Sequence, residues 1–462
     1  MSDMYKPLLS SFIAVAATAV VSASQTNRLP NIVIIFTDDQ GYGDLGCFGA
    51  EGFATPNIDK MASEGVRFTD FYVAATVCSP SRAALMTGCY PKRVGLEKRV
   101  LLPNSKTGLN PSEITIAEML KQKGYATGIF GKWHLGDKEK FMPLNQGFDR
   151  YFGLPYSNDM AVDVDFGNGK KIHRKNYPKL PLYDQDKVIA LEPDQTQLTR
   201  RYTEQACRFI RENRGRPFFV YLPHSMPHVP LAASSSFLGK TKRGLYGDVI
   251  TEVDWSVGKL LQTLKDTGQD RNTLVIYSSD NGPWKPYGDM AGSAGPLRNG
   301  KGTTWEGGQR VPTIMWWPGK LPAGKVCRTL TSTIDIMPTI AGLTGSVLPQ
   351  DRIIDGKNIW NIMIHPESAK TPHKAFYYYA VNGKIEAIRS GKWKLHVAKC
   401  RGWNNNKNGP FKISLYDLSS DVAEKHNVAD DNPEVVKTLT AMLRRFDAEL
   451  TRTARPVGRL QH

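Results

Sequence analysis

Short apolar runs alternate with amphipathic segments along the first three quarters of the chain. Asn31 to Thr37 is a continuous run of β-branched and aromatic residues, which is typical of a parallel strand buried on both faces. Similar runs follow at 126–130, 217–222 and 273–278, and segments with helical spacing lie at 55–64, 114–123, 198–212 and 248–265. This alternation predicts an α/β sandwich with a large, mostly parallel sheet flanked by helices.

The pattern changes near residue 345, a boundary that such reading places to within about 15 residues. Strand-like pieces occur at 387–389, 393–396 and 415–418, and 433–450 has the spacing of an amphipathic helix. We therefore expect a main domain over residues 25–345. A C-terminal subdomain over 346–462 is expected to contain a small antiparallel sheet with a helix.

Residues 1–24 have the features of a signal peptide. Lys6 precedes a largely apolar run from Leu8 to Val21, and Val21-Ser22-Ala23 resembles a cleavage site. The run is short for a membrane span, although an uncleaved anchor is the alternative. We expect an exported protein, periplasmic or secreted, with no stable membrane span.

The chain of 462 residues has a formal net charge of +16, from 60 Lys and Arg against 44 Asp and Glu. These cations are spread along the sequence without a basic arm or a nucleic-acid-binding motif, so an anionic substrate is expected rather than nucleic acid. The six cysteines form no C-x-x-C pair, which argues against a structural zinc site. Composition leaves the oligomeric state open.

Polar residues follow the predicted strands where each one ends. They are Asp38-Asp39, Lys132 and His134, His224 and His228, and Asp280-Asn281. Open α/β sheets place their ligands at the carboxyl ends of strands, so these residues are expected to share one site. Carboxylate and amide oxygens suit Ca²⁺ or Mg²⁺. Asn281-Gly282 alone would be read as a turn. The two pairs Asp38-Asp39 and Asp280-Asn281, each after an apolar strand, favour a metal site instead.

The segment Cys78-Ser79-Pro80-Ser81-Arg82 predicts a helix N-terminus. Proline suits the first turn, and Gly88 can end the helix in a left-handed cap. Cys78 would then lie where free N–H groups favour an anion, with Arg82 on the same helix face. A buried structural cysteine is the alternative.

The full string C-x-P-S-R-x-x-x-x-T-G resembles the signature of the sulfatase family, and several other strings resemble its arylsulfatase A-like members. The resemblance implies an alkaline-phosphatase-like fold. It also implies that a formylglycine-generating enzyme oxidises Cys78 to Cα-formylglycine. Asp38, Asp39, Asp280 and Asn281 would then bind Ca²⁺, or Mg²⁺, together with residue 78.

Four further strings carry implied roles. In G-K-W-H-L-G, Lys132 would contact the sulfate, and His134, two residues along an extended stretch, would assist the formylglycine hydrate. P-H-x-P selects His228 as the catalytic histidine, with His224 as a supporting residue. G-K-x-T-x-x-E-G-G assigns sulfate binding to Lys301, with Arg298 near the rim. P-Y-S-x-D gives Ser157 a sulfate contact, although Asn158 stands where arylsulfatase A has a histidine.

The implied activity is the hydrolysis of sulfate esters, in a sulfated small molecule or glycan or in a glycolipid. The hydrate at position 78 would attack sulfur while Arg82, Lys132 and Lys301 hold the sulfate, and His228 would protonate the leaving oxygen. A phosphoester or phosphonate hydrolase of the same superfamily is one alternative. A silent protein that binds sulfated glycans with unconverted Cys78 is the other.

Overall fold

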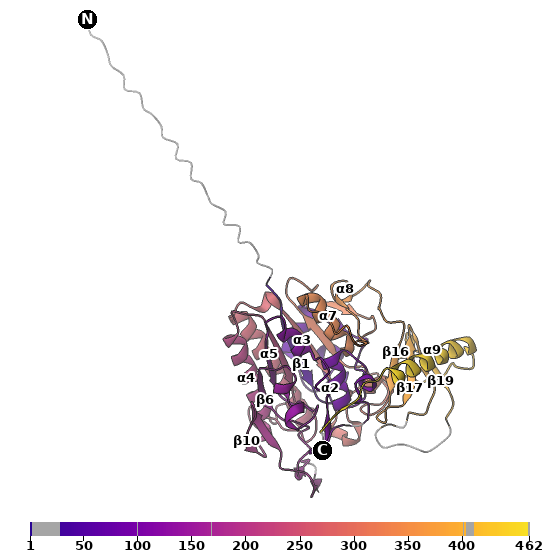
Figure 1. Cartoon of the computed structure of the whole chain (residues 1–462), viewed down its shortest axis with the longest axis horizontal. Helices are drawn as coiled ribbons and strands as arrows, with labels where there is room; N and C mark the ends of the chain where they lie inside the picture. The colour runs from indigo at the N-terminus through magenta and orange to yellow at the C-terminus, as the bar shows by residue number, and fades with distance from the viewer. Residues whose placement is uncertain (2–27, 99, 168, 401, 403–410, 461–462) are drawn as a thin grey trace.

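A mixed sheet of ten strands forms the centre of the main domain (Figure 1). The computed structural model describes residues 1, 28–98, 100–167, 169–400, 402 and 411–460, so the expected signal peptide lies, apart from Met1, outside them. The strand order is β10 (Lys187–Leu191), β9 (Pro181–Asp184), β6 (Arg150–Gly153), β5 (Ala126–Phe130), β11 (Phe218–Pro223), β1 (Asn31–Thr37), β12 (Thr273–Ser279), β13 (Thr313–Trp316), β2 (Val66–Phe68) and β14 (Lys325–Cys327).

The five central strands, from β6 to β12, run parallel to one another. Strands that pair antiparallel with their neighbours extend the sheet on both sides. At one edge, β14 pairs with β2 in parallel. The predicted α/β sandwich is therefore confirmed, with the parallel character concentrated at its centre. Strand β1 lies between β11 and β12 and is buried along its whole length, as its unbroken apolar run predicts.

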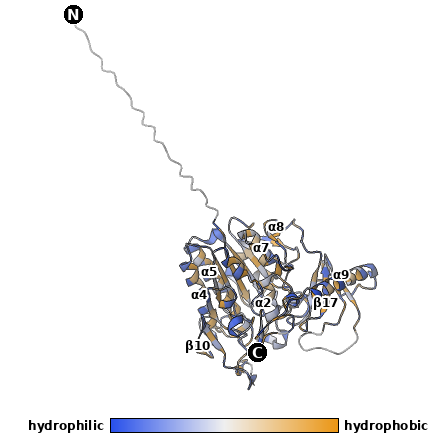
Figure 2. Cartoon of the chain, viewed as in Figure 1, coloured by the Kyte–Doolittle hydropathy of each residue, from blue (hydrophilic) through white to orange (hydrophobic). Residues whose placement is uncertain are grey.

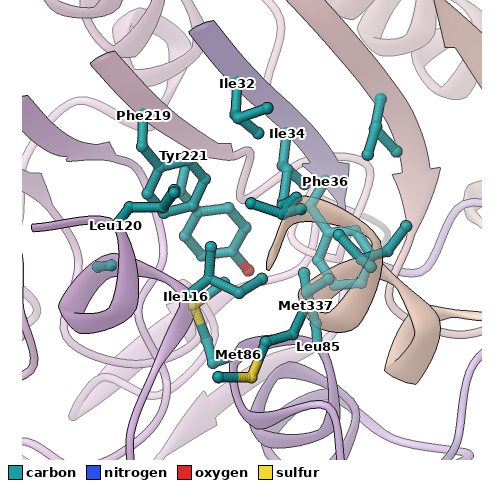
Figure 3. Packing of buried hydrophobic residues seen from close by; sticks show 14 of the residues in the cluster. Ile32, Ile34, Phe36, Leu85, Met86, Ile116, Leu120, Phe219, Tyr221 and Met337 are labelled. Atoms are coloured by element: carbon teal, nitrogen blue, oxygen red, sulfur yellow. The ribbon is translucent and has the colours of Figure 1, made fainter. Parts of the chain in front are cut away.

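Alternate side chains of β1 enter two hydrophobic layers. Ile32, Ile34 and Phe36 pack toward α2 (Cys78–Thr87), α3 (Ile116–Lys121) and α7 (Ile336–Thr344) (Figure 3). Residues of α8 (Trp360–Ile364) belong to the same hydrophobic layer. Val33 and Ile35 face α1 (Pro56–Ser63), α4 (Leu198–Glu212) and α5 (Leu245–Asp266) on the other side. The sheet is thus covered on both faces, which explains why its central strands are mostly apolar, with their polar residues mainly near the strand ends.

The long helices α4 and α5 are apolar on one side only, and Figure 2 shows both colours along them. In α4 the buried positions include Leu198, Tyr202, Ala206 and Ile210, a spacing of one helical turn. The bounds of α4 are those that the sequence predicts. Helix α5 begins three residues earlier than expected, at Leu245, directly after Gly244 with a φ of 69°.

The C-terminal subdomain contains an antiparallel sheet in the order β16 (Phe376–Tyr379), β17 (Ile385–Ser390), β18 (Trp393–His396) and β19 (Ser414–Asp417). Helix α9 (Pro433–Arg452) packs on it through Leu439 and Leu443, which meet Ile388 and Leu395. The expected small sheet with a C-terminal helix is confirmed, and Figure 1 shows it beside the main domain.

Three two-stranded ribbons complete the fold. They pair β3 (Phe71–Tyr72) with β15 (Thr331–Ser332), β4 (Thr107–Gly108) with β20 (Gly458–Arg459), and β7 (Asp163–Asp165) with β8 (Lys171–His173). A short helix, α6 (Glu306–Gln309), follows the Gly-rich segment. Within the described residues, no helix is both long and apolar enough to cross a membrane.

Candidate active site

Three carboxylates meet at the ends of two adjacent parallel strands. Asp38 and Asp39 follow β1, Asp280 follows β12, and Cys78 is the first residue of α2. One potential ligand atom from each of these four buried residues lies within 4.8 Å of the others. Asn281 donates from Nδ2 to Asp39 Oδ1 at 2.8 Å, while its own buried Oδ1 has no partner among the described residues. This set of hard oxygen donors, with one acceptor unsatisfied, fits Ca²⁺ or Mg²⁺.

Three buried cations face these carboxylates. Arg82 donates from Nε and Nη2 to Asp280 Oδ2 at 3.1 and 2.8 Å, as its position one helical turn after Cys78 allows. Lys132 Nζ contacts Asp38 Oδ2 and also donates to Ser157 Oγ at 3.1 Å. Lys301 Nζ lies 2.7 Å from Asp39 Oδ1. The expected cations thus come together with the expected acids.

The acids respond to this environment in opposite ways. Burial alone would raise the pKa of Asp38, but Lys132, His228, Arg82 and Lys301 outweigh it and hold the pKa well below its usual range. For Asp280, burial and the neighbouring Asp38 raise the pKa to about 7 despite Arg82. The protein's own cations therefore do not stabilise all three negative charges equally.

Cys78 in its unmodified form is poorly suited to nucleophilic attack. Its Sγ donates to Asp38 Oδ1 at 3.3 Å. Burial and the charge of Asp38 raise the pKa of the thiol well above its ordinary value. Because the thiolate is the nucleophilic form, an unmodified Cys78 would be almost inert at neutral pH.

The histidines occupy three different environments. His228 lines the pocket, with Nε2 3.5 Å from Asp39 Oδ2 and Nδ1 2.5 Å from the Val229 carbonyl. His224 is turned toward α5, where its Nε2 lies 3.1 Å from Ser256 Oγ, and burial lowers its pKa to about 3. Of the two histidines that follow β11, the structure therefore brings His228 to the site.

His134 also lines the pocket, but it does not lie in the extended stretch expected from its sequence. Its φ of 62° turns the chain, and its Nε2 lies 2.9 Å from the Leu101 carbonyl. A carbonyl only accepts, so Nε2 carries the proton and Nδ1, which has no partner among the described residues, is left as an acceptor. Burial, together with Lys132 and Arg82, lowers the pKa of His134 well below its usual value.

A pocket of about 220 Å³ opens beside Cys78. The expected residues His134, Ser157, His228 and Lys301 line it, together with Val100, Leu102, Asp159, Met160, Arg174, Tyr177 and Trp284. Arg298 points elsewhere, because it donates to the Glu424 carbonyl at 2.6 Å and covers the ring of Trp305. Asn158 donates to the Pro230 carbonyl at 3.1 Å and so holds the loop of His228.

Sequence reasoning missed the pocket residues Asp159, Arg174, Tyr177 and Trp284. Trp284 comes three residues after Asn281, so the strand-end pattern could have included it, and its ring lies 4.3 Å from Lys301 Nζ. Arg174 and Tyr177 follow the β7–β8 ribbon, whose three-residue strands give almost no periodic signal. The basic stretch 170–179 was the available clue.

The fold and this cluster define a hydrolytic enzyme of the alkaline-phosphatase-like α/β class. A family model described as Sulfatase matches residues 30–346, and one described as N-sulphoglucosamine sulphohydrolase, C-terminal, matches 300–449. Human arylsulfatase A is 37% identical, covering 96% of this chain and 92% of that protein. N-acetylgalactosamine-6-sulfatase of Canis lupus familiaris is 38% identical over 83% of this chain and 74% of its own length.

A crystal structure of Ps i-CgsB in complex with k-i-k-neocarrahexaose superposes with a TM-score of 0.79 and 31% identity, covering 93% of this chain and 94% of that one. The chain belongs to the sulfatase family, with arylsulfatase A-like character, and is a sulfuric ester hydrolase. These matches do not favour the phosphoester hydrolase or the silent binding protein.

Proposed function

We propose that this sulfatase removes sulfate from a sulfated glycan and that it does so with Cys78 converted to Cα-formylglycine. The observation that carries the proposal is the position of Cys78, at the start of α2, beside Asp38 and in one pocket with Lys301, Ser157 and His228. The inert thiol described above supports a modified residue, and conversion requires a formylglycine-generating enzyme. The hydrate of that aldehyde would supply an oxygen nucleophile.

Asp38, Asp39, Asp280 and Asn281 are proposed to hold a divalent cation, Ca²⁺ rather than Mg²⁺, together with residue 78. When bound, the cation would act as a Lewis acid that offsets negative charge at the sulfate. The preference for Ca²⁺ rests on the family resemblance, because carboxylate and amide oxygens serve both ions.

The chain's own cations would bind and orient the sulfate. Lys301 lines the pocket, while Lys132 reaches Ser157 Oγ and Arg82 lies behind the carboxylates. Lys301 and Ser157 are thus placed to contact the sulfate oxygens, and Lys132 orients the Ser157 hydroxyl. Fixed donors of this kind stabilise the charge that develops in the transition state without having to reorganise.

Two histidines would move protons on opposite sides of the reaction. Nδ1 of His228 is engaged by the Val229 carbonyl, so Nε2 is the atom from which we propose that the leaving oxygen takes its proton. Nδ1 of His134 has a free lone pair and is the proposed acceptor for the hydroxyl proton at residue 78 when sulfate is released.

The glycan assignment rests on the pocket wall and on a relative. Trp284 and Tyr177 present rings at the pocket, and aromatic faces suit the apolar faces of sugar rings. The relative Ps i-CgsB was crystallised with k-i-k-neocarrahexaose. Export to the periplasm or the medium, through the signal peptide at 1–24, is part of the same proposal.

Two measurements test the proposal. Peptide mass spectrometry of active enzyme is expected to show residue 78 as an aldehyde, and active enzyme that carries only cysteine there would overturn the nucleophile. His228→Ala is expected to lose about 10²–10⁴-fold more kcat on a sugar sulfate than on nitrophenyl sulfate, because nitrophenolate leaves without a proton. His224→Ala is the matched control. Equal losses on the two esters would reduce His228 to a sulfate-binding residue.

A further inference from the structure

A basic element that contributes nothing to the proposed sulfate site covers part of the pocket. It consists of the β7–β8 ribbon and the residues that follow it, to Lys179. Arg174 and Tyr177 from this element line the pocket together with Cys78 and Lys301. The Arg174 guanidinium lies over the Tyr177 ring, 5.4 Å from its centroid, and 24% of the side chain is exposed. The stacking restricts Arg174 while leaving its edge accessible.

The guanidinium is only partly used by the protein. Its hydrogen bond within the described residues runs from Nη1 to the backbone carbonyl of Asp159. Nη2 lies 3.9 Å from Asp159 Oδ2, which is beyond hydrogen-bond distance. The Asp159 carboxylate therefore offsets the charge of Arg174 without occupying the donors of its fork. A planar guanidinium with free donors is suited to bind a carboxylate or sulfate through two bonds.

The surrounding charges favour the same kind of ligand. The acids of the ribbon are already paired, Asp163 with His173 at 2.8 Å and Asp165 with Lys171 at 3.0 Å. Lys175 and Lys179 are exposed, and no ion pair engages them within the described part of the chain. Arg174 thus lines the pocket from an element with an excess of positive charge, which raises the local concentration of anions.

We propose that Arg174 forms a subsite for a second anionic group, a carboxylate or a second sulfate, on the sugar that carries the scissile ester. The proposal rests on the proposed function and deepens it, because it specifies a substrate with two negative groups. Lys301, Ser157 and Lys132 are the residues proposed for the scissile sulfate, so Arg174, which lines the same pocket from a different element, is assigned to the alcohol part of the ester.

The test compares Arg174→Gln with wild type on four esters: nitrophenyl sulfate, a sugar with one sulfate, the same sugar with a second sulfate, and a disaccharide that adds a uronate. The variant is expected to lose about 10- to 100-fold in kcat/KM on one or both dianionic sugars, the scale of a charged hydrogen-bond pair. The kcat/KM of Arg174→Gln should change less than about twofold on nitrophenyl sulfate and on the sugar with one sulfate. This unchanged activity also shows that the variant folds. Comparing the loss on the uronate-containing disaccharide with the loss on the disulfated sugar identifies whether the subsite binds a carboxylate or a sulfate.

Two further variants sharpen the result. Asp159→Asn removes the nearby negative charge and is expected to raise kcat/KM on the dianionic sugar several-fold, the opposite sign to Arg174→Gln. Arg444→Gln, an exposed arginine on α9, is the matched control and should change nothing. Equal kcat/KM of wild type on monoanionic and dianionic sugars, or equal losses in Arg174→Gln on all esters, would overturn the subsite. Wild type that hydrolyses nitrophenyl sulfate but no sugar sulfate would instead overturn the glycan assignment.

Discussion

The molecule buries two clusters of charged side chains, one beside the pocket of Cys78 and one enclosed between α6 and the C-terminal sheet. The strand-end cluster consists of Asp38, Asp39, Asp280, Arg82, Lys132 and Lys301, at the ends of β1 and β12. The interface cluster consists of Glu306, Lys394, Glu424, Tyr72 and Tyr378, where α6 of the main domain meets the C-terminal sheet. Both contain acids and cations that are almost inaccessible to solvent.

In the interface cluster every carboxylate oxygen has a donor. Tyr378 and Lys394 donate to Glu306 Oε1 at 3.0 and 2.9 Å, and Tyr72 donates to Oε2 at 2.5 Å. Lys394 Nζ also lies 2.9 Å from Glu424 Oε1, and the Glu306 backbone N–H donates to Glu424 Oε2 at 2.7 Å. The carboxylate oxygens of the strand-end cluster also have donors, but the Oδ1 acceptor of the adjacent Asn281 has no partner among the described residues.

One acid of each cluster has a lowered pKa, Asp38 and Glu306, whereas the pKa of Asp280 is raised. Burial alone would raise the pKa of Glu306, but Lys394, Arg310 and Arg389 outweigh it and hold the pKa below its ordinary value. Asp280 moves the other way, to about 7. Glu306 of the interface cluster is thus held ionised by the protein's own cations and links α6 to the C-terminal sheet. In the strand-end cluster three acids face three cations beside the pocket, and a bound divalent cation would favour the ionised form of Asp280 and give Asn281 Oδ1 a partner.

The largest expected effect comes from Asp280→Asn. We expect kcat/KM to fall on the order of 10³-fold, because a Lewis acid contributes several kcal/mol. Without metal, the free energy of unfolding should also fall, by about 3–5 kcal/mol, because the substitution removes the carboxylate that pairs with the buried Arg82. Chemical denaturation of chelated protein and a sulfate-release assay measure the two quantities.

The same variant tests metal linkage. Wild type should gain about 2.7 kcal/mol of stability at a Ca²⁺ concentration 100 times the Kd, and Asp280→Asn should gain far less at that concentration. An equal gain in both proteins would contradict a site at Asp280, and full activity after verified removal of metal would contradict the cation.

Lys394→Met should affect stability. Removing one partner of a buried ion pair leaves Glu306 and Glu424 facing each other, and such losses cost about 3–5 kcal/mol. Lys392→Met is the matched control, because Lys392 is 51% exposed in its pair with Asp417 and should change stability by less than about 1 kcal/mol. Denaturant unfolding distinguishes the two variants. A Lys394→Met protein as stable as Lys392→Met would remove the distinction between the clusters.

Most of the strand-end cluster was predictable from local rules, whereas Lys301 was expected only from the family resemblance. Parallel strands end at one edge of the sheet, so Asp38 and Asp280 were expected together, and helical spacing joined Arg82 to Cys78. The interface cluster was not predictable in this way. Glu306 meets Lys394, 88 residues later, through the packing of α6 against the C-terminal sheet. No periodic pattern encodes such a contact.

Other misses have equally local causes. His134 has a φ of 62° and contacts the Leu101 carbonyl, which is distant in sequence. The alternation of side chains along an extended strand could not predict this backbone conformation. Arg174 reaches the pocket from the segment between β6 and β9. The strands of this segment, β7 and β8, are too short to give a periodic signal in the sequence. The division near residue 345, the signal peptide and the residue roles stay predictions.

The smallest expected effect is a pH dependence of the stability that Glu306 contributes to the interface cluster. The pKa of Glu306 is lower in the folded protein than in the unfolded chain, where it is about 4.3. The unfolded chain therefore binds the proton first as the pH falls, and the stabilisation that the carboxylate provides is present above about pH 5 and declines below it. The difference in unfolding free energy between wild type and Glu306→Gln should shrink by about 1 kcal/mol from pH 6 to pH 3.5.

Glu434→Gln, at an 85% exposed position on α9, should show almost no change. A difference that stays constant or grows toward acid pH would mean that Glu306 is not held as a carboxylate, and the two clusters would then share one electrostatic character.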